Sequence, residues 1–283
     1  MSGAKRVGWT LLHDSAKDRR IFQSRAFVIP EESGLQLLKP VMTDFLPHAS
    51  PATIAQSVRA LEPWITKFTV LGETYGGTYD GLNDDRVSRL PQFFPRCRRI
   101  LEVGCLEGAH TVVLSRGFPY TDIVALDGRA ANLERARFLT SLYGCRRVDF
   151  GVADLENADL TAYGKFDVCV CVGLLYHLWE PWKFLRRVGA QAEGLWLWTV
   201  ICDEASAEVV RDGYRGRIYA EGPLSDALSA LRAQSFFPTL GSLTQMLRDA
   251  GFNDVHAMNF ETTPNGPSVS LVCKKETYRF AGQ

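Results

Sequence analysis

Short apolar runs recur along the chain from about residue 100, and stretches with helical spacing separate them. Five runs rich in Val, Ile and other apolar residues occupy residues 100–104, 122–128, 148–154, 166–176 and 194–202. Between the second and third runs, Leu133, Ala136 and Leu139 recur at helical spacing, and Gly144 supplies a stop signal. Residues 180–192 and 242–252 have the same helical character. Buried strands alternating with helices indicate a parallel sheet wrapped by helices.

Two more apolar runs, at residues 255–260 and 268–274, follow without a helix between them. The turn-rich sequence TTPNGP joins them, which predicts a hairpin. The last strand is therefore expected to run antiparallel to the others.

The first 99 residues have a different pattern. Helical spacing appears around residues 34–46 and 53–68, and a Gly- and Tyr-rich stretch follows at 72–84. We expect a helical N-terminal region that covers one end of the sheet. A second irregular insertion, residues 203–239, separates the fifth strand from the last helix.

Composition places the chain among globular proteins. Of 283 residues, 46% are hydrophobic, and 32 basic side chains balance 32 acidic ones. We expect a cytoplasmic protein without a membrane partner, because no apolar stretch reaches about 18 residues and the N-terminus lacks a signal-peptide core. Seven cysteines without a CxxC pair indicate neither a disulfide framework nor a zinc site, and no metal is expected. Zero net charge does not favour nucleic acid.

Polar residues and glycines gather where the predicted parallel strands end, which is where open parallel sheets bind ligands. The first strand leads into a turn that carries Glu102, Gly104 and Gly108, and the next two strands end in Asp127 and Asp154. Such a turn can let a ligand approach the backbone closely, although a purely structural turn is the alternative. Either aspartate can instead cap a helix. An acid inside the turn suits a cationic ligand, which favours S-adenosylmethionine over a dinucleotide.

This ordered set of residues, together with FDVCVCVGLLYHLWEP (166–181), resembles the class I S-adenosylmethionine-dependent methyltransferases. The resemblance covers roughly residues 97–275. It implies an α/β fold with a Rossmann-like, seven-stranded, mostly parallel sheet in the order 3-2-1-4-5-7-6, helices on both faces and a helical N-terminal extension. We accordingly expect an N-terminal helical or lid region (1–96), a cofactor-binding core (97–202), an insertion that forms the acceptor pocket (203–239) and a C-terminal completion of the core (240–283).

The resemblance also implies which residues bind S-adenosylmethionine and, after transfer, S-adenosylhomocysteine. Glycines of the turn and of the fourth strand would lie along the methionine moiety, and Glu102 would orient its ammonium. Asp127 would bind the ribose, while Asp154 and the backbone of Leu155 would contact the adenine. The full set of expected cofactor-binding residues is Glu102, Gly104, Cys105, Gly108, Asp127, Gly128, Asp154, Leu155 and Gly173.

Three segments are similar to the tRNA wobble-uridine carboxymethyltransferases and their small-molecule relatives: LEPWITKF (61–68), LYHL (175–178) and residues 235–252. Those enzymes hold the carboxylate of carboxy-S-adenosylmethionine with a Lys, a Tyr and an Arg. Lys67 and Tyr176 match the first two, but the arginine is missing. Methyl transfer is therefore expected rather than carboxymethyl transfer.

Methyl transfer from a sulfonium depends mainly on positioning, and a general base is needed only when the acceptor must lose a proton. His177 is the candidate base, with a structural histidine as the alternative, and Tyr176 is a candidate catalytic residue that acts as a wall of the pocket. His110 and Trp198 are expected to be structural. Acceptor-binding candidates from the irregular segments are Tyr75, Tyr79, Tyr176, Arg217, Tyr219 and Phe236, although the tyrosines can serve only in packing and Arg217 can pair with Glu221.

The leading hypothesis is a methyltransferase that acts on the O, N or S atom of a small molecule, in specialised metabolism. The first 99 residues contain 14 basic and 10 acidic side chains, so modification of tRNA stays open as a second hypothesis. A non-catalytic cofactor-binding module and a dinucleotide oxidoreductase are further alternatives. The sequence leaves the oligomeric state open, a homo-oligomer included.

Overall fold

The computed structural model describes residues 49–275 and, for the backbone alone, a short hairpin of β1 (Leu11–His13) and β2 (Arg20–Phe22). The helix predicted around residues 34–46 lies outside the described residues. Most of the basic side chains in the first 25 positions lie outside them as well.

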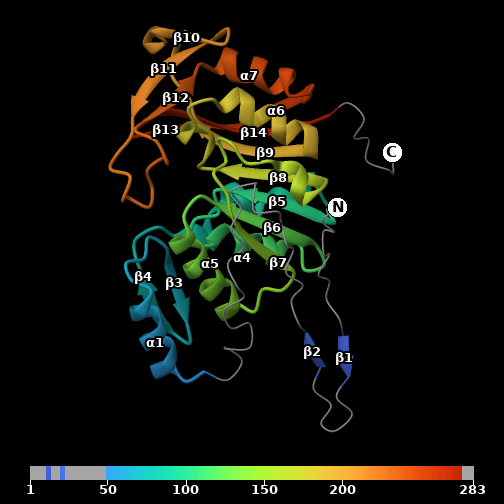
Figure 1. The fold of residues 1–283 in the computed structure, drawn as a ribbon, viewed down its shortest axis with the longest axis vertical. Coiled ribbons are helices and arrows are strands. Elements are labelled where there is room, and N and C mark those ends of the chain that lie inside the picture. Colours follow the sequence, from blue (N-terminus) through green and yellow to red (C-terminus); the bar gives the residue numbers. More distant parts are fainter. Residues whose placement is uncertain (1–10, 14–19, 23–48, 276–283) are drawn as a thin grey trace, which may run out of the picture.

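A seven-stranded sheet forms the centre of the molecule (Figure 1). In chain order its strands are β5 (Arg99–Val103), β6 (Asp122–Asp127), β7 (Val148–Val152), β8 (Phe166–Val172), β9 (Ala192–Val200), β13 (Asp254–Thr263) and β14 (Gly266–Lys274). Their spatial order, β13-β14-β9-β8-β5-β6-β7, confirms the predicted order read from the opposite edge. The last strand, β14, is antiparallel to β9 and to β13, as predicted. The other five strands, β7, β6, β5, β8 and β9, are parallel to one another.

Strand β8 shows why the apolar runs are continuous rather than alternating. Cys169 and Cys171 face the cluster of apolar residues on one side of the sheet, whereas Val168 and Val170 belong to the cluster on the other side. A strand buried on both faces has apolar residues at every position. Burial raises the pKa of the Cys171 thiol to about 12, so the thiol stays protonated near neutral pH and is unreactive.

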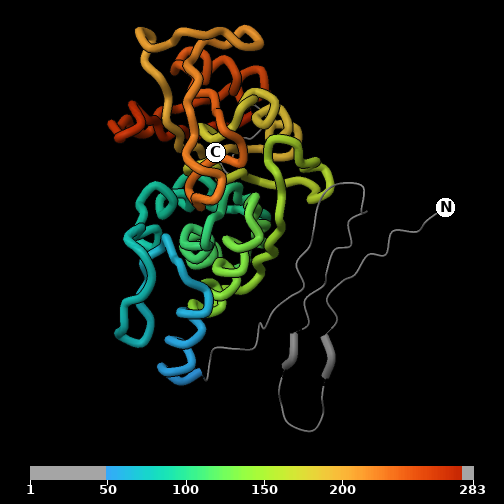
Figure 2. The backbone as a smooth tube through the Cα atoms, turned by 60° about the vertical axis from the view of Figure 1, so that its left-hand side comes forward, coloured from blue at the N-terminus to red at the C-terminus, as the bar shows by residue number. Residues whose placement is uncertain are grey.

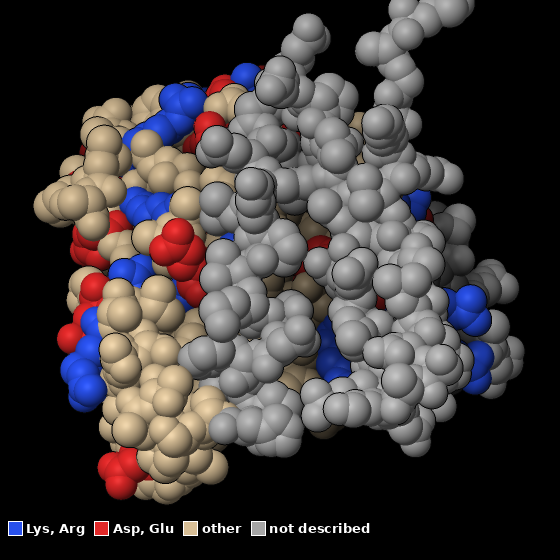
Figure 3. Space-filling model, turned by 60° about the horizontal axis from the view of Figure 1, so that its bottom comes forward, with Lys and Arg blue, Asp and Glu red and all other residues tan. Residues whose placement is uncertain are grey.

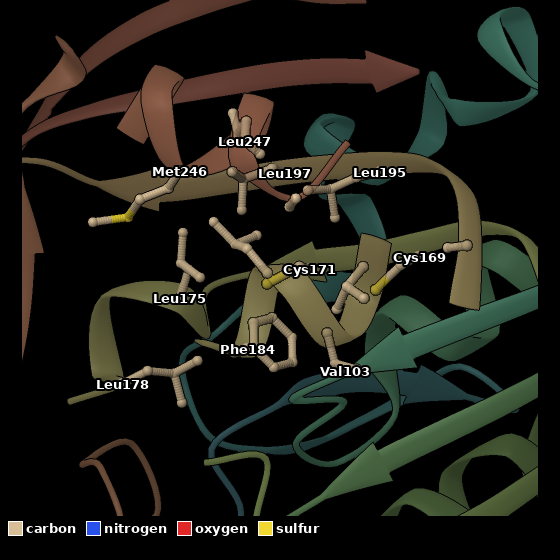
Figure 4. Packing of buried hydrophobic residues seen from close by; sticks show 14 of the residues in the cluster. Val103, Cys169, Cys171, Leu175, Leu178, Phe184, Leu195, Leu197, Met246 and Leu247 are labelled. Atoms are coloured by element: carbon tan, nitrogen blue, oxygen red, sulfur yellow. The ribbon is translucent and has the colours of Figure 1, made fainter. Parts of the chain in front are cut away.

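Four helices cover the two faces of the sheet: α4 (Ala109–Gly117), α5 (Ala130–Leu142), α6 (Pro181–Gln191) and α7 (Leu240–Asp249). Phe184 of α6 and Leu247 of α7 belong to the same apolar cluster as Leu197 of β9, so both helices lie on one face (Figure 4). On the other face, Leu114 of α4 belongs to the cluster that contains Ile100 of β5. Helix α5 packs beside α4.

The described N-terminal segment is less helical than the sequence predicts. It contains α1 (Pro51–Ala60), a hairpin of β3 (Lys67–Val70) and β4 (Glu73–Gly76), the 3-10 turn η2 (Gly81–Asn83), and the short helices α2 (Asp85–Ser88) and α3 (Leu90–Phe93). The helix predicted over 53–68 ends at Ala60, because Pro63 cannot continue it and the Trp64 indole Nε1 donates to the Val58 carbonyl oxygen at 3.0 Å. Figure 1 and Figure 2 place this segment beside α4 and α5.

The insertion at 203–239 contains regular strands, although the sequence analysis predicted an irregular segment. It contains the 3-10 turn η5 (Glu204–Ser206) and a three-stranded antiparallel sheet of β10 (Val209–Arg211), β11 (Tyr214–Ala220) and β12 (Gln234–Pro238). Two further 3-10 turns, η3 (Leu160–Tyr163) and η4 (Leu175–His177), belong to the core. Asp212 and Gly213 join β10 to β11 with positive φ angles of 49° and 85°. An Asp-Gly pair between two strands is a strong hairpin signal, and the sequence carries it.

Candidate functional site

A cavity of about 390 Å³ lies at the carboxyl ends of the parallel strands. The N-terminal segment and the insertion both contribute to its wall. Most of the residues proposed from the sequence for cofactor binding and catalysis line it, together with one proposed for the acceptor: Gly104, Cys105, Asp127, Gly128, Asp154, Leu155, Gly173, Tyr176, His177 and Tyr79. The size lies within the range that is usual for small-molecule sites.

The turn after β5 forms the floor of one end of the cavity. Gly104 has a φ angle of 70°, and its N–H donates to the Leu126 carbonyl oxygen at 2.8 Å. Gly108 lies behind the turn rather than in the cavity wall: a Cβ atom there would lie 3.0 Å from Ala136 of α5. The two glycines thus have different roles: Gly104 faces the cavity, whereas Gly108 permits close packing of α4 on α5.

Asp127 ends β6 and holds the turn in place. Its carboxylate accepts from the Leu106 N–H at 3.0 Å, from the Arg129 N–H at 2.9 Å and from the Asn132 side-chain amide at 3.0 Å. Burial raises the pKa of Asp127, and these donors oppose the rise. Asp127 thus stabilises the loops on both sides of it while it lines the cavity.

Asp154 follows β7 and is exposed at the cavity wall. It accepts from the Glu156 N–H at 3.0 Å and from the Asn157 side chain at 2.8 Å, so it stabilises the turn that presents Leu155 to the cavity. No helix begins at Asp154, so the alternative of a helix cap is not what the structure shows: the aspartate stabilises a turn, in a position that faces the cavity.

Glu102 is absent from the cavity wall and lies beneath the turn, 2% exposed. Its Oε2 accepts from the Thr111 hydroxyl at 2.7 Å, whereas Oε1 has no hydrogen-bond partner among the described residues. Burial raises the pKa of Glu102 to about 8. An orphaned, buried carboxyl oxygen of this kind fits a cationic group above the turn, because a nearby positive charge favours the ionised form.

His177 lines the cavity and pairs with Glu221, which is buried behind it. The His177 Nδ1 lies 3.1 Å from both carboxylate oxygens of Glu221. Glu221, whose side chain is 2% exposed, also accepts from the Ser235 hydroxyl at 2.6 Å and the Ala230 N–H at 3.2 Å. Burial acts to raise the pKa of Glu221, but the bonds from His177, Ser235 and Ala230 outweigh it and lower the pKa. The sequence alternative, an Arg217–Glu221 surface pair, is not formed.

Tyr176 packs beside this pair, with its ring centroid 4.2 Å from that of His177. Burial raises the pKa of Tyr176 to about 12, so its hydroxyl is neutral near pH 7. A neutral phenol at this place is consistent with the expected wall residue rather than with a base.

A second polar cluster, which we call the Asp84 cluster, consists of Tyr79, Asp84, Arg86 and His110. Asp84 accepts from the Arg86 Nε at 2.9 Å, and its Oδ2 lies 2.9 Å from the His110 Nε2. The Tyr79 hydroxyl lies 2.8 Å from the same histidine nitrogen. The Arg86 guanidinium stacks on the Trp198 ring at 4.4 Å. Tyr79, Arg86, His110 and Trp198 all line the cavity, although His110 and Trp198 were expected to be structural and Arg86 was not considered.

Four residues proposed for the acceptor do not line the cavity. Tyr75 packs on Phe68, with ring centroids 5.9 Å apart. Phe236 is fully buried in the core against Trp182. Tyr219 stacks on Phe237 at 4.6 Å, and Arg217 donates to the Asn265 carbonyl oxygen at 2.7 Å. Tyr75 thus packs within the β3–β4 hairpin, and the other three pack around β11 and β12 of the insertion. The insertion reaches the cavity through residues 227–232.

The segment 227–232 closes over the end of the cavity near β6. Arg129, just after β6, donates to the carbonyl oxygens of Ala230 at 3.2 Å and Leu224 at 3.3 Å. Leu231 lies directly over Gly128, where a Cβ atom would come within 2.5 Å of the leucine side chain. A side chain at position 128 would therefore require the Leu231 side chain to move.

Within residues 49–275, no group of three or more His, Cys, Asp or Glu side chains is arranged to hold a metal ion. In the part of the chain that the structure describes, no helix has both the length and the apolar character required to cross a membrane. Lys67, which matches a carboxylate-binding lysine of the carboxymethyltransferases, forms an ion pair with Asp80 at 3.1 Å and does not line the cavity.

A Rossmann-like sheet with a glycine turn and strand-end acids around one cavity is the arrangement of an enzyme that binds an adenosyl cofactor. The family described as "Methyltransferase domain" matches residues 100–191. The N-terminal domain of EvdMO1, crystallised in the presence of SAH (S-adenosylhomocysteine) and D-fucose, is 31% identical, with a TM-score of 0.72; the match covers 81% of this chain and 98% of that domain. Full-length EvdMO1 is matched over 49% of its length, with 31% identity and a TM-score of 0.65. No curated protein matches by sequence.

The chain belongs to the S-adenosylmethionine-dependent methyltransferases, and S-adenosylmethionine is its cofactor. The chain spans about half of full-length EvdMO1. The structure of the EvdMO1 domain with SAH bound matches equally well, with a TM-score of 0.72.

Binding of S-adenosylhomocysteine is expected to release nearly one proton at pH 7. With a pKa of about 8, Glu102 is protonated in the free protein at this pH, and the ligand ammonium favours its ionised form. Because the proton leaves on binding, affinity should rise with pH up to about 8. Calorimetry in buffers of different ionisation enthalpy measures the released protons. Glu102→Gln should remove this release, and an unchanged value in that variant contradicts the assignment.

Proposed function

We propose that the protein transfers the methyl group of S-adenosylmethionine to a hydroxyl group of a small molecule, with a sugar as the acceptor class. The cofactor supplies an activated methyl group on a sulfonium. The chain supplies the position of the acceptor and a place for its proton. The pairing of His177, which lines the cavity, with the buried Glu221 is the observation that carries this proposal.

The contacts with Glu221 determine which ring nitrogen of His177 carries a hydrogen in the neutral form of the side chain. Because the pKa of Glu221 is lowered, its carboxylate is ionised at neutral pH and can only accept. Nδ1 of His177 therefore carries a hydrogen, and in the neutral form of the ring the lone pair lies on Nε2. A neutral imidazole held in one tautomer is suited to take a proton from a hydroxyl group. A sulfur acceptor that is already a thiolate needs no such group.

A sugar is supported by the neighbouring EvdMO1 domain and by the wall of the cavity. That domain was crystallised in the presence of D-fucose as well as SAH. In this chain, the aromatic rings of Tyr176 and Trp198 and the amide of Asn265 lie around the same cavity. Aromatic side chains beside hydrogen-bonding groups match a ring with one apolar face and several hydroxyl groups.

The experiment is an assay of methyl transfer from labelled S-adenosylmethionine to a panel of free and nucleotide-linked deoxyhexoses, with matched amines and thiols. We expect label on a sugar hydroxyl and a rate that depends on a basic group. Transfer only to the amines or thiols would contradict the proposal, as would transfer to none of the panel.

A tRNA acceptor is the second candidate, and it rests on the sequence resemblance. In the described part of the face shown in Figure 3, Lys and Arg side chains are interspersed with Asp and Glu. Mixed charge of this kind does not favour a polyanionic partner. Transfer of label to bulk tRNA, tested beside the sugar panel, would support the tRNA acceptor.

A further inference from the structure

The loop between β11 and β12 connects two separate places in the cavity wall. Its residues 227–232 line the cavity, and Leu231 lies over Gly128, just after β6. At the base of the loop, the side chain of Glu221 pairs with His177. One loop therefore joins the end of the cavity near β6 to the candidate base.

Backbone bonds within this loop do not fix its position on the sheet. Residues 222–232, which we call the 222–232 loop, contain turns but no helix or strand. The Ser229 N–H, for example, donates to the Asp226 carbonyl oxygen at 3.2 Å, inside the loop itself. Leu224 is 59% exposed, so its side chain contributes little apolar burial. A segment of this kind opens at a low free energy unless groups outside it hold it in place.

Arg129, which follows β6, holds the loop from outside. Its Nη2 donates to the carbonyl oxygens of Leu224 at 3.3 Å and of Ala230 at 3.2 Å, so one guanidinium spans the loop. The backbone N–H of Arg129 donates to the Asp127 carboxylate at 2.9 Å, which fixes the arginine at the end of β6. Ala230, which is buried, is thereby held in place relative to the central sheet.

Ala230 in turn contacts the partner of His177. Its N–H donates to Oε2 of Glu221 at 3.2 Å, and the Ser235 hydroxyl of β12 donates to Oε1 at 2.6 Å. A buried carboxylate depends on such donors, because water does not replace them. These two donors orient the Glu221 carboxylate where both of its oxygens lie 3.1 Å from the His177 Nδ1. Without the Ala230 N–H, one oxygen loses its donor from the loop, and the carboxylate is free to turn.

We propose that Arg129 is a positioning residue of the reaction and acts on His177 through the 222–232 loop. Arg129 holds the loop, and the Ala230 N–H of the loop orients Glu221. Glu221 then keeps the hydrogen of the neutral imidazole on Nδ1. The inference rests on the proposed role of His177 as a base, and it adds the residues that keep this base in place.

The first test is a double-mutant cycle, measured as kcat at saturating S-adenosylmethionine with the best sugar acceptor. Arg129→Gln removes the charged donor to the loop and should lower kcat about tenfold, as for one hydrogen bond from a charged group. In the Glu221→Gln background the same change should have almost no effect, because the connection to His177 is already broken. Arg129→Lys, which keeps a charged donor, should retain most of the activity.

Arg137→Gln is the matched control for this cycle. Arg137 also donates to a backbone carbonyl oxygen at 3.2 Å, that of Phe150, but it does not line the cavity. Its replacement should leave kcat unchanged. If Arg129→Gln lowers kcat by the same factor with Glu221 and with glutamine at position 221, Arg129 acts by another route and the proposal is overturned. Full activity of Arg129→Gln overturns it as well.

The second test needs no acceptor. Long-range proton–nitrogen NMR spectra of histidine-labelled protein, saturated with S-adenosylhomocysteine at a pH where the ring is neutral, report which ring nitrogen carries the hydrogen. The signal of His177 is the one that His177→Gln removes. We expect a single Nδ1–H tautomer in the unmodified protein and a mixture of tautomers in Arg129→Gln. A single Nδ1–H tautomer in that variant contradicts the proposal. If the spectra change as expected but the unmodified protein methylates no hydroxyl acceptor, the role of His177 as a base fails and the positioning by Arg129 stands.

Discussion

Replacement of His177 by glutamine is expected to lower kcat for a hydroxyl acceptor by about 10²- to 10⁴-fold, the usual contribution of a positioned general base. The imidazole is the cavity-lining group whose tautomer is fixed, through the 3.1 Å contacts of its Nδ1 with Glu221. Glutamine keeps hydrogen-bonding capacity toward Glu221 but cannot take up a proton. Steady-state kinetics with the best sugar acceptor measure the loss, and calorimetry should show unchanged affinity for S-adenosylhomocysteine.

Two further variants separate a base from a merely structural histidine. Glu221→Gln should reduce kcat by a smaller factor and alter the pH profile, because a neutral amide no longer fixes one tautomer of His177. Tyr176→Phe should change kcat only slightly, since a phenol with a pKa of about 12 acts as a wall. If Tyr176→Phe were as damaging as His177→Gln, or if His177→Gln kept full activity, the assignment of the base would fail.

The second large effect is expected on cofactor binding when Asp127 becomes asparagine. A carboxylate that accepts from two ribose hydroxyls makes two charge-assisted hydrogen bonds, each about 1.5–3 kcal/mol, so affinity for S-adenosylhomocysteine should fall about 10²- to 10⁴-fold. The amide must also turn an NH₂ group toward the Leu106 or Arg129 N–H, which disturbs the turn. Calorimetry measures the affinity, and thermal unfolding of the free protein measures the structural part.

Asp154→Asn is the matched control for this variant. Asp154 is exposed and bonds to Glu156 and Asn157, so the same change there should weaken binding far less. Equal affinity of Asp127→Asn and the unmodified protein would show that Asp127 is only a structural cap of the two loops.

Strand positions could be predicted because burial on two faces makes a strand apolar at every position. Runs such as residues 166–176 are apolar at every position, and β8 begins at the first residue of that run. The order itself came from the resemblance to a known family. The hairpin β3–β4 was missed. The apolar spacing up to residue 68 predicts a helix, but β3 begins at Lys67. Tertiary contacts outweigh local spacing in a segment of this kind.

The strand-end residues of the site could also be predicted, since parallel strands bring their carboxyl ends to one edge of a sheet. The partners of those residues could not. His177 and Glu221 are 44 residues apart, and they meet because β11 pairs with β12 while the Phe236 N–H of β12 donates to the Leu178 carbonyl oxygen beside η4. Arg86 likewise lies in a segment that has no motif, and its place depends on the ring of Trp198, 112 positions later. Sequence patterns carry local spacing, whereas these contacts depend on how distant elements pack.

The bonds of Glu107, a buried residue of the turn after β5, have a consequence for the order in which the chain folds. The two N–H groups that it accepts belong to Ile65 and Thr66, 42 and 41 residues earlier, so the contact closes a long loop. Loop closure costs entropy that is recovered only when the carboxylate is already in place. We therefore expect the N-terminal segment to dock after the glycine turn has formed on the sheet.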